Sequence, residues 1–317
     1  MKSTEYSPFV MAISSRALFN LEEENRIFEQ EGEKAYMQYQ QEHEKEILPP
    51  GNAFPLVKSF MNLNRLLPGE KQIEIIIVSR NNADSGLRIF NSIEHYQLGI
   101  TRAAFTSSQP VHEYLKAFGV VLFLSANEDD VRHALQHSIP AGLIYPSFLP
   151  SFSSPEEEDN PCIRIAFDGD AVIFSEEAEL IYQRKGLDAF IEHENKKAGT
   201  PLPEGPFARL LRHLSFLQHE LKDGHRYIRT ALITARSSPS HERVIRTLRK
   251  WKIRIDEMFF LGNFPKQPIL QAFRPHIFFD DQEIHCRPAS SVVPTARVPN
   301  SNVEKAARER KNTQRKK

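Results

Sequence analysis

The stretch IRIAFDGDAVIFSEEAE, residues 163 to 179, contains the pattern from which the second half of this chain can be interpreted. Alternating apolar residues from 163 to 167 predict a strand, and the glutamates between 176 and 179 favour the first turn of a helix. Asp168 and Asp170 therefore fall on a strand-to-helix loop. Binding groups collect at that end of an α/β sheet, because the crevice beyond the carboxyl ends of the strands is open. Asp-Gly is also a common turn dipeptide, so a structural turn is the alternative for the pair taken alone.

The composition indicates a globular chain of two folded units. The sequence has 317 residues, of which 40% are hydrophobic, and this length favours two domains over one. No apolar run approaches the roughly 18 to 20 residues of a membrane span, and the first residues lack the pattern of a secretory leader. Two cysteines are too few for a disulfide framework. We therefore expect a cytoplasmic protein without a membrane partner.

The balance of charge argues against nucleic-acid binding by the chain as a whole. Lysine plus arginine and aspartate plus glutamate each number 41, so the chain has no global field. Basic residues gather only in the C-terminal stretch EKAARERKNTQRKK, which has little apolar content. We therefore expect residues 291–317 to form a disordered basic tail, and we expect no specific nucleic-acid partner.

The order of the predicted elements is that of an α/β protein in which one rhythm occurs twice. Strands alternate with helices in both halves, as in the βαβ units of a parallel sheet. The predicted strands are FVMAISS (9–15), IEIIIVS (73–79), AAFT (103–106), VVLFLSA (120–126), residues 163–168, YIRTALIT (227–234), EMFFL (257–261) and HIFFD (276–280). Residues 22–47 predict one long charged helix. The Pro-, Ser- and acid-rich stretch 146–161 predicts a linker between a domain 1–145 and a domain 162–290.

The two halves also match along their sequences, which indicates an internal duplication. MAISSRALFNLEEENRIFEQEG aligns with IAFDGDAVIFSEEAELIYQRKG, IIIVSRN with ALITARS, and LFLSANE with IFFDDQE. The aligned pairs are Ser14 with Asp168, Arg16 with Asp170, Ser79 with Thr234, Ser125 with Asp280, and Ala126 with Asp281. Because the first half keeps the apolar frame and lacks these acids, we expect chemistry in the second half only.

Polar residues of the second half follow an order that resembles the haloacid dehalogenase superfamily. The order is Asp168 and Asp170, then Thr234, then Lys266, then Asp280 and Asp281. In a parallel sheet, strand ends so far apart in the chain face one crevice. The strings FDGDAVIFSEEAE, ITARS, PKQPIL, RPHIFFDDQ and AISSRALFNLEEE resemble the cytosolic 5'-nucleotidase I family, and the resemblance runs from about Phe9 to Cys286.

This resemblance implies a fold and a set of roles. It implies two Rossmann-like parallel-sheet halves, of which the second is haloacid dehalogenase-like with a small helical cap at about residues 176–225. Asp168 would attack phosphorus to form an aspartyl-phosphate, and Asp170 would protonate the departing 5'-oxygen and then activate water. Thr234 and Lys266 would bind the phosphate, whose developing charge needs such contacts.

The resemblance also implies a Mg²⁺ cofactor, an ion that prefers oxygen ligands. Its protein ligands would be Asp168, the backbone carbonyl of Asp170, and Asp280 or Asp281. Each residue taken alone also has an alternative structural role. Asp280 and Asp281 are also typical of a turn. Thr234 likewise suits a helix N-cap, and Lys266 suits a surface loop.

A cap excludes water and contacts the part of a substrate that does not react. The expected substrate-binding residues are Phe190, His193, Glu194, Thr234, Arg236 and Lys266. Phe190, His193 and Glu194 would touch the base or ribose, and helix packing or solvation is the alternative for each. Arg236 would reach the phosphate, or lie at the surface where a helix begins.

The predicted function is Mg²⁺-dependent hydrolysis of nucleoside 5'-monophosphates, AMP or IMP, to nucleoside and phosphate. Two alternatives stay open. One is a phosphatase with the same machinery that acts on another phosphomonoester, such as a sugar phosphate. The other is a protein that senses nucleotides without catalysis. The sequence leaves open whether the chain forms a homo-oligomer.

The first half carries hydroxyls and cations where the second carries acids. Ser14, Arg16, Ser79 and Arg80 would stand at the corresponding strand ends, without a carboxylate. Arginine side chains and hydroxyl groups can donate hydrogen bonds to an anion without a metal, so one hypothesis is a site for a phosphate-bearing effector. The alternative is a scaffold in which Arg16 pairs with the helix acids of residues 22–24.

Overall fold

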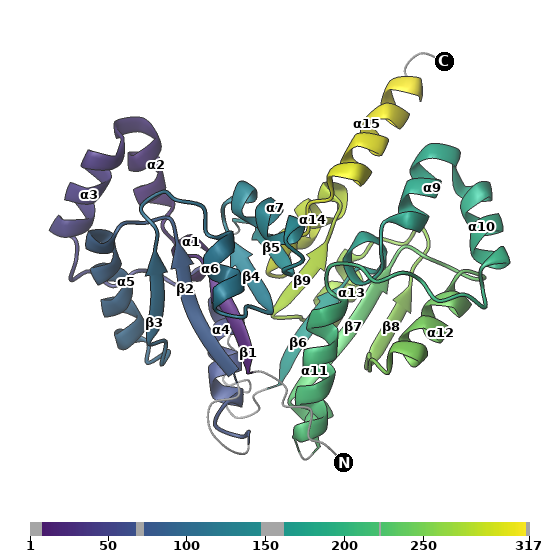
Figure 1. Ribbon diagram of the computed structural model, residues 1–317, viewed down its shortest axis with the longest axis horizontal. Coiled ribbons are helices and arrows are strands. Elements are labelled where there is room, and N and C mark those ends of the chain that lie inside the picture. The colour runs from purple at the N-terminus through teal and green to yellow at the C-terminus, as the bar shows by residue number, and fades with distance from the viewer. Residues whose placement is uncertain (1–7, 68–72, 147–161, 222, 315–317) are drawn as a thin grey trace. The chain divides into compact units, whose positions relative to one another are not determined.

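The computed structural model describes residues 8–67, 73–146, 162–221 and 223–314 (Figure 1). Within these ranges the chain divides into two compact units, one up to Ile144 and one from Tyr145 onward. Apart from Pro146, the predicted linker 146–161 lies outside the described residues. None of the helices in the described part of the chain has the length and apolarity that a membrane span needs.

The first unit is built on a parallel sheet with the strand order β3-β2-β1-β4-β5. Its strands are β1 (Phe9–Ile13), β2 (Ile73–Ser79), β3 (Arg102–Phe105), β4 (Leu122–Ser125) and β5 (Ala141–Ile144). Its helices are α1 (Ser15–Leu18), α2 (Glu22–Glu31), α3 (Glu33–Glu42), α4 (Phe54–Leu63), α5 (Ala83–His95), α6 (His112–Ala117) and α7 (Glu128–Gln136). The central strand β1 is buried along its whole length, as expected for a parallel strand covered on both faces.

The second unit contains a parallel sheet with the order β10-β9-β6-β7-β8. Its strands are β6 (Ile163–Phe167), β7 (Ile228–Thr234), β8 (Glu257–Phe260), β9 (Ile277–Asp280) and β10 (Thr295–Arg297). Its helices are α9 (Glu177–Lys185), α10 (Leu187–Lys196), α11 (Ala208–Glu220), α12 (His241–Trp251), α13 (Gln267–Phe273), α14 (Glu283–Ser290) and α15 (Ser301–Gln314). A tight turn, Gly169–Ile173, follows β6 and is closed by a hydrogen bond from Phe174 N to Gly169 O at 2.9 Å, and a short 3₁₀ turn, Gly224–Arg226, precedes β7.

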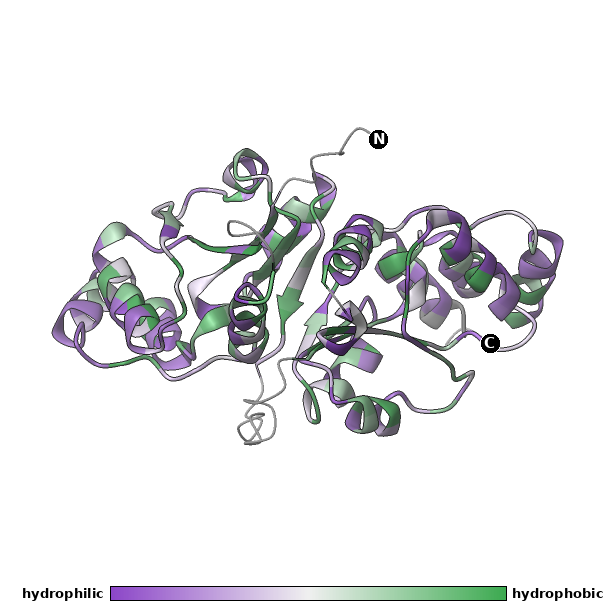
Figure 2. Ribbon diagram, turned by 90° about the horizontal axis from the view of Figure 1, so that it is seen from below, coloured by the Kyte–Doolittle hydropathy of each residue, from purple (hydrophilic) through white to green (hydrophobic). Residues whose placement is uncertain are grey.

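The predicted α/β class with parallel strands is confirmed in both units. Hydrophobic colour in Figure 2 follows the strands of each unit, whereas the surrounding helices show both colours. This distribution reflects amphipathic helices that turn one face toward a buried sheet. Two strands that we did not predict, β5 and β10, lie at one edge of their unit's own sheet.

The predicted long helix over residues 22–47 is wrong in two respects, because it ends at Glu42 and is not continuous. It is divided at Gly32 into α2 and α3, because Gly32 has a φ of 87°, a conformation that glycine adopts more readily than other residues. Gly186 divides α9 from α10 in the same way, with a φ of 86°. Figure 1 shows each pair as two neighbouring helices joined by a tight turn.

The predicted disordered tail over residues 291–317 also differs from the structure. Residues 295–297 form strand β10, and α15 packs against α9. Asn300 starts the helix, because its side chain accepts hydrogen bonds from the backbone N–H groups of Asn302 (3.1 Å) and Val303 (3.2 Å). Val303 and Ala306 are buried, so the basic charges occupy only part of the helix surface. Residues 315–317 lie outside the described part.

Candidate active site

Four polar residues of the second unit meet where neighbouring parallel strands end. Asp168 directly follows β6, Thr234 ends β7, and Asp280 ends β9, with Asp281 after it. Strands β9, β6 and β7 are adjacent, so these ends lie at one edge of the sheet. The backbone N–H of Asp168 donates to the carbonyl of Phe279 at 2.8 Å, which fixes Asp168 beside β9.

Lys266 joins two of these carboxylates. Its Nζ lies 2.7 Å from Asp168 Oδ1 and 2.6 Å from Asp280 Oδ2, and all three side chains are buried. Burial lowers the pKa of Lys266, but the charges of Asp168 and Asp280 outweigh that effect and raise it above its usual value. Burial raises the pKa of Asp168 to about 7, against the opposing effect of the Lys266 charge.

Asp281 is a buried carboxylate whose oxygens lack hydrogen-bond partners in the described residues. Its pKa is raised well above the usual value, first by burial and then by the charges of Asp280 and Asp168. Such a group is costly unless something cationic satisfies it.

The three aspartates Asp168, Asp280 and Asp281 offer oxygens that all lie within 4.8 Å of one another. The orphaned oxygens of Asp281 and the all-oxygen donor set fit a hard divalent cation such as Mg²⁺. Three of the four predicted metal ligands are thus brought together by their side chains. The prediction for Asp170 concerns its backbone carbonyl, and it stays a prediction.

Asp170 takes part in a second buried network, centred on Arg236. The guanidinium of Arg236 forks onto Asp170, with Nε 2.8 Å from Oδ2 and Nη2 2.7 Å from Oδ1. Its Nη1 also donates to Glu194 Oε2, and Glu194 Oε1 accepts from Arg243 Nη1 at 2.7 Å. Burial raises the pKa of Glu194, but the two arginine charges lower it below its usual value. Arg236 therefore lies at the site, and the surface alternative for it is wrong.

The turn after β6 places Asp170 toward Arg236. Within the turn Gly169–Ile173, Asp170 has extended backbone angles and Ala171 has a φ of 61°, so the chain reverses sharply there. A Cβ on Gly169 would lie 3.3 Å from Thr234 Oγ1, which is a tight contact. Thr234 Oγ1 accepts from the backbone N–H of Arg236 at 3.2 Å. Glycine at position 169 thus lets the loop lie close to the end of β7.

Of the three predicted substrate contacts on α10, Phe190 and Glu194 contact the same arginine, and His193 contacts Glu194. The Arg236 guanidinium is 5.3 Å from the centre of the Phe190 ring, a cation–π geometry. His193 has ring nitrogens 3.1 Å from Glu194 Oε1 and 3.2 Å from Glu177 Oε1. Helix α10 therefore brings an aromatic ring and a network of charged groups to the side of the site that carries Asp170.

Two residues of the site were not predicted. Arg243 is a fully buried arginine on α12, and Glu179 is a buried glutamate on α9. Burial raises the pKa of Glu179 to about 7, and its Oε1 accepts from Gln282 Nε2 at 3.2 Å. Arg243 could have been noticed because it stands next to Val244, which has Leu248 one helical turn later, whereas Glu179 has the pattern of an ordinary acid in the first turn of a helix.

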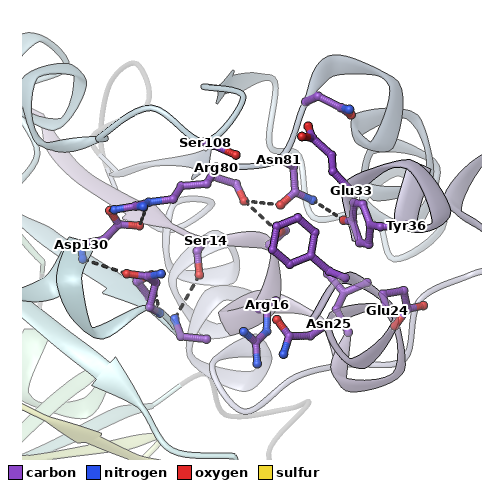
Figure 3. A pocket seen from close by; sticks show the side chains of 18 residues that line it. Ser14, Arg16, Glu24, Asn25, Glu33, Tyr36, Arg80, Asn81, Ser108 and Asp130 are labelled. Atoms are coloured by element: carbon purple, nitrogen blue, oxygen red, sulfur yellow. Dashed lines mark hydrogen bonds and ion pairs between the residues drawn. The ribbon is translucent and has the colours of Figure 1, made fainter. Parts of the chain in front are cut away.

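The corresponding strand ends of the first unit border a separate pocket of about 250 Å³ (Figure 3). Its lining includes the four residues predicted there, Ser14, Arg16, Ser79 and Arg80. The expected absence of carboxylates is wrong, because the lining also includes Glu24, Glu33 and Asp130.

Both arginines of this pocket have acidic partners. Arg80 forks onto Asp130, with Nη2 2.6 Å and Nε 2.9 Å from Oδ1, as Figure 3 shows. Arg16 Nη2 donates to Glu22 Oε1 at 3.1 Å, so the predicted pairing of Arg16 with the acids of α2 is present. The Nε of Arg16 is buried and has no partner among the described residues.

Comparisons with known proteins agree with this geometry. The sequence model of a family described as 5'-nucleotidase matches residues 1–305. The chain is 39% identical to human (Homo sapiens) cytosolic 5'-nucleotidase 1B over 285 residues, which cover 87% of this chain and 46% of the relative. It thus spans about half the length of that relative. No solved structure matches it significantly.

Proposed function

Because the chain belongs to the 5'-nucleotidase family, we propose that it is a Mg²⁺-dependent enzyme that hydrolyses nucleoside 5'-monophosphates, AMP or IMP. The observation that carries this proposal is the buried set of Asp168, Lys266 and Asp280 beside the orphaned Asp281. A phosphoryl group in transfer spreads charge over its oxygens, and catalysis needs an in-line nucleophile surrounded by cations. A carboxylate held by a lysine next to a cation site meets both needs.

The metal would be held by Asp168, Asp280 and Asp281, whose oxygens already gather within 4.8 Å. When bound, Mg²⁺ would neutralise charge on the phosphate, which four neighbouring carboxylates would otherwise repel. Lys266 contributes a fixed positive charge, because its Nζ lies 2.7 Å from Asp168 Oδ1. Thr234, at the end of β7, donates its hydroxyl to a phosphate oxygen.

We propose that the covalent step divides between the two aspartates. An oxygen of Asp168 attacks phosphorus, the bond from phosphorus to the ribose 5'-oxygen breaks, and an aspartyl-phosphate forms. When Asp170 is protonated and one of its oxygens is released from the Arg236 fork, it would give its proton to the departing 5'-oxygen, and it would later take a proton from the water that hydrolyses the intermediate. Arg236 is a positioning residue here, because its fork fixes the carboxyl group of Asp170.

The non-phosphate part of the substrate would meet helices α9 and α10, which we propose as the cap. Phe190 supplies an aromatic face for the base, and it lies above the arginine that orients Asp170. His193 and Glu194 supply polar groups for the base or ribose. Binding of the nucleoside and orientation of the proton donor would therefore be coupled through Arg236.

An internal duplication is supported by contacts that recur in both units. The two sheets have the same strand order when β1 to β5 are matched with β6 to β10. Ser14 N donates to Leu124 O at 2.9 Å, as Asp168 N donates to Phe279 O at 2.8 Å. The α2–α3 and α9–α10 pairs bend at Gly32 and Gly186 respectively, so the cap would be duplicated with the sheet.

A buried arginine and a hydroxyl repeat in the same way. Arg88 Nε donates to Glu46 O at 3.0 Å, and Arg243 Nε donates to Thr200 O at 2.8 Å. One helical turn later, Ser92 Oγ accepts from the backbone N–H of Leu48, as Thr247 Oγ1 does from Leu202. Side-chain contacts of this kind are too specific to recur through a shared fold class alone.

We also propose a cytoplasmic location, because the human relative is named as cytosolic. The partner implied by the proposed reaction is a nucleoside monophosphate. We propose no specific nucleic-acid partner, and the formation of a homo-oligomer stays a prediction.

Release of phosphate from a panel of nucleoside 5'-monophosphates and sugar phosphates, with Mg²⁺ or with EDTA, tests the proposal. We expect turnover of AMP or IMP that EDTA abolishes and that Asp168→Asn removes. The matched control is Asp188→Asn, which changes an exposed aspartate of α10. Turnover of sugar phosphates alone would favour another phosphatase, and nucleotide binding without any turnover would favour a sensor.

A further inference from the structure

The pocket of the first unit stands where the duplication places a second copy of the candidate active site. Its volume of about 250 Å³ is near the lower end of small-molecule sites, which suits a mononucleotide rather than a larger ligand. Ser14 follows β1 as Asp168 follows β6, and Ser79 ends β2 as Thr234 ends β7. The position of the pocket relative to its own sheet is therefore that of a phosphate-binding site.

The aligned positions of this pocket carry a more positive net charge than the corresponding positions of the candidate active site. Position by position, the first unit has Ser14 for Asp168, Arg16 for Asp170, Asn81 for Arg236, Val111 for Lys266, Ser125 for Asp280 and Ala126 for Asp281. Four carboxylates and two cations are thus replaced by one cation and no carboxylate. The second unit needs a metal to admit a phosphate dianion, whereas these positions of the first unit do not.

Donors for a phosphate are present at these strand ends. The Nε of Arg16 is buried without a partner among the described residues, and it lines the pocket. Ser14 Oγ accepts from the backbone N–H of Ala126 at 3.3 Å, which leaves its own hydroxyl proton free to donate. Ser79 Oγ donates to Asn81 Oδ1 at 3.0 Å and accepts from Ser15 Oγ at 3.0 Å, so these two hydroxyls hold the edge in place and Ser14 is the hydroxyl that can donate to a ligand. Hydroxyls and a guanidinium are sufficient to bind phosphate oxygens.

The carboxylates that line the pocket do not cancel this preference. Glu24 pairs with Arg88 at 2.7 Å, and Asp130 is held by the Arg80 fork. The remaining acid, Glu33, is exposed at the start of α3. The ion pairs neutralise the two buried acids. Glu22, which pairs with Nη2 of Arg16, is 48% exposed and is not part of the lining, so the Nε of Arg16 stays available to a ligand.

An aromatic wall completes the pocket. The rings of Phe28 and Tyr36 meet edge to face with centres 5.8 Å apart, as Tyr182 and Phe190 do at 6.5 Å in the second unit. Asn81 Nδ2 donates to the hydroxyl of Tyr36 at 2.9 Å, which links this wall to the end of β2 (Figure 3). A base that lies against Phe28 and Tyr36 would extend toward the strand ends, where its phosphate could reach Arg16.

We propose that the first unit binds a nucleoside 5'-monophosphate without metal and without hydrolysing it. The choice of nucleotide rests on the proposed function, because the ligand class is taken from the matching aromatic wall of the second unit. Hydrolysis is excluded at this site because position 14 carries a serine without a neighbouring base and the cation-binding aspartates are absent from positions 125 and 126.

The test is calorimetric titration of AMP into the full-length Asp168→Asn protein in EDTA, which suppresses turnover and metal-dependent binding. We expect a metal-independent site that Arg16→Ala weakens by about 10-fold to 100-fold, the effect of losing hydrogen bonds to a charged group. Arg26→Ala is the matched control, since this arginine of α2 is 64% exposed and lies 3.9 Å from Glu23. It should leave the affinity for AMP unchanged.

A second variant separates the two parts of the ligand. Phe28 is 44% exposed, so the Phe28→Ala protein should fold. It should bind AMP more weakly, whereas the affinity for inorganic phosphate, measured by its competition with AMP, should be unchanged. No heat of AMP binding in EDTA, or equal affinity and stoichiometry in the Arg16→Ala protein, would overturn the proposal. Because this titration contains no metal and no turnover, its outcome is independent of whether the second unit proves to be a nucleotidase.

Discussion

Replacing Asp281 by asparagine should make the metal-free protein more stable and at the same time remove its response to Mg²⁺. The carboxylate of Asp281 is buried, lacks a hydrogen-bond partner in the described residues, and lies beside two further aspartates. Asparagine has nearly the same shape but no charge, and its amide N–H groups can donate to the neighbouring carboxylates. The substitution therefore relieves repulsion in the absence of metal and removes a ligand in its presence.

The size of the effect follows from the separation of the carboxylates. At the 4.8 Å limit of the cluster and an effective dielectric constant of about 20, each pair of like charges costs about 3 kcal/mol. Lys266 offsets part of this cost, and protonation of Asp281 offsets more, because its pKa is raised. We expect a net gain of about 2 kcal/mol, which corresponds to about 4 to 8 °C in the melting temperature of a domain of this size.

The assay is urea and thermal unfolding at pH 7.5 in EDTA and in excess Mg²⁺. The parent protein should gain about 3 kcal/mol when Mg²⁺ reaches about 100 times its dissociation constant, and Asp281→Asn should gain far less. Asp188→Asn serves as the control, because this exposed carboxylate should change stability by less than about 1 kcal/mol. Destabilisation of the Asp281→Asn protein in EDTA, or an undiminished shift with Mg²⁺, would refute the reasoning.

Three further outcomes are expected. Lys266→Met should reduce phosphate release at least about 100-fold, because the nucleophile loses its cationic neighbour; initial rates of the folded variant check this, and a loss below about 5-fold would contradict it. Arg236→Lys should reduce kcat about 10-fold or more, since lysine cannot fork onto Asp170; an unchanged kcat would show that the fork is dispensable. The third outcome concerns pH, because burial raises the folded-state pKa values of Asp168 and Glu179 to about 7, above their usual values. Their protonated forms therefore stabilise the metal-free fold at low pH, and up to about 3 kcal/mol per group is lost as the pH rises from 5 to 8. Unfolding midpoints in EDTA across this range measure the loss, Mg²⁺ should reverse it at pH 8, and a flat profile would contradict the assignment.

Much of the sheet and the strand-end part of the site could be predicted because both depend on local pattern. Alternating and continuous apolar runs predicted eight strands, and each is present within a residue or two of its expected bounds. Asp168, Thr234 and Asp280 could then be brought together, since parallel neighbours end at one edge of a sheet. Strands β5 and β10 were missed because AGLI and TAR are too short and too small in side chain to show a pattern.

The partners of the charged groups could not be predicted from local pattern. Glu194 lies 42 residues from Arg236 and 49 residues from Arg243 along the chain, and nothing in the intervening sequence states that they meet. Arg80 is a second example. From the sequence it was expected to be available for an anion, but in the structure it pairs with Asp130, 50 residues away. Such pairs form only when helices from different parts of the chain pack over the sheet.

From the sequence we could therefore predict eight of the strands and their order, the strand ends that carry acids, and the contrast between an acidic second half and a first half without those acids. Which carboxylates are paired and which lack a partner became known from the fold. Asp280 gains Lys266 while Asp281, the next residue, gains no partner among the described residues. The reason is physical: residue type fixes the charge a side chain can carry, but packing fixes how much water it loses and which opposite charge replaces that water.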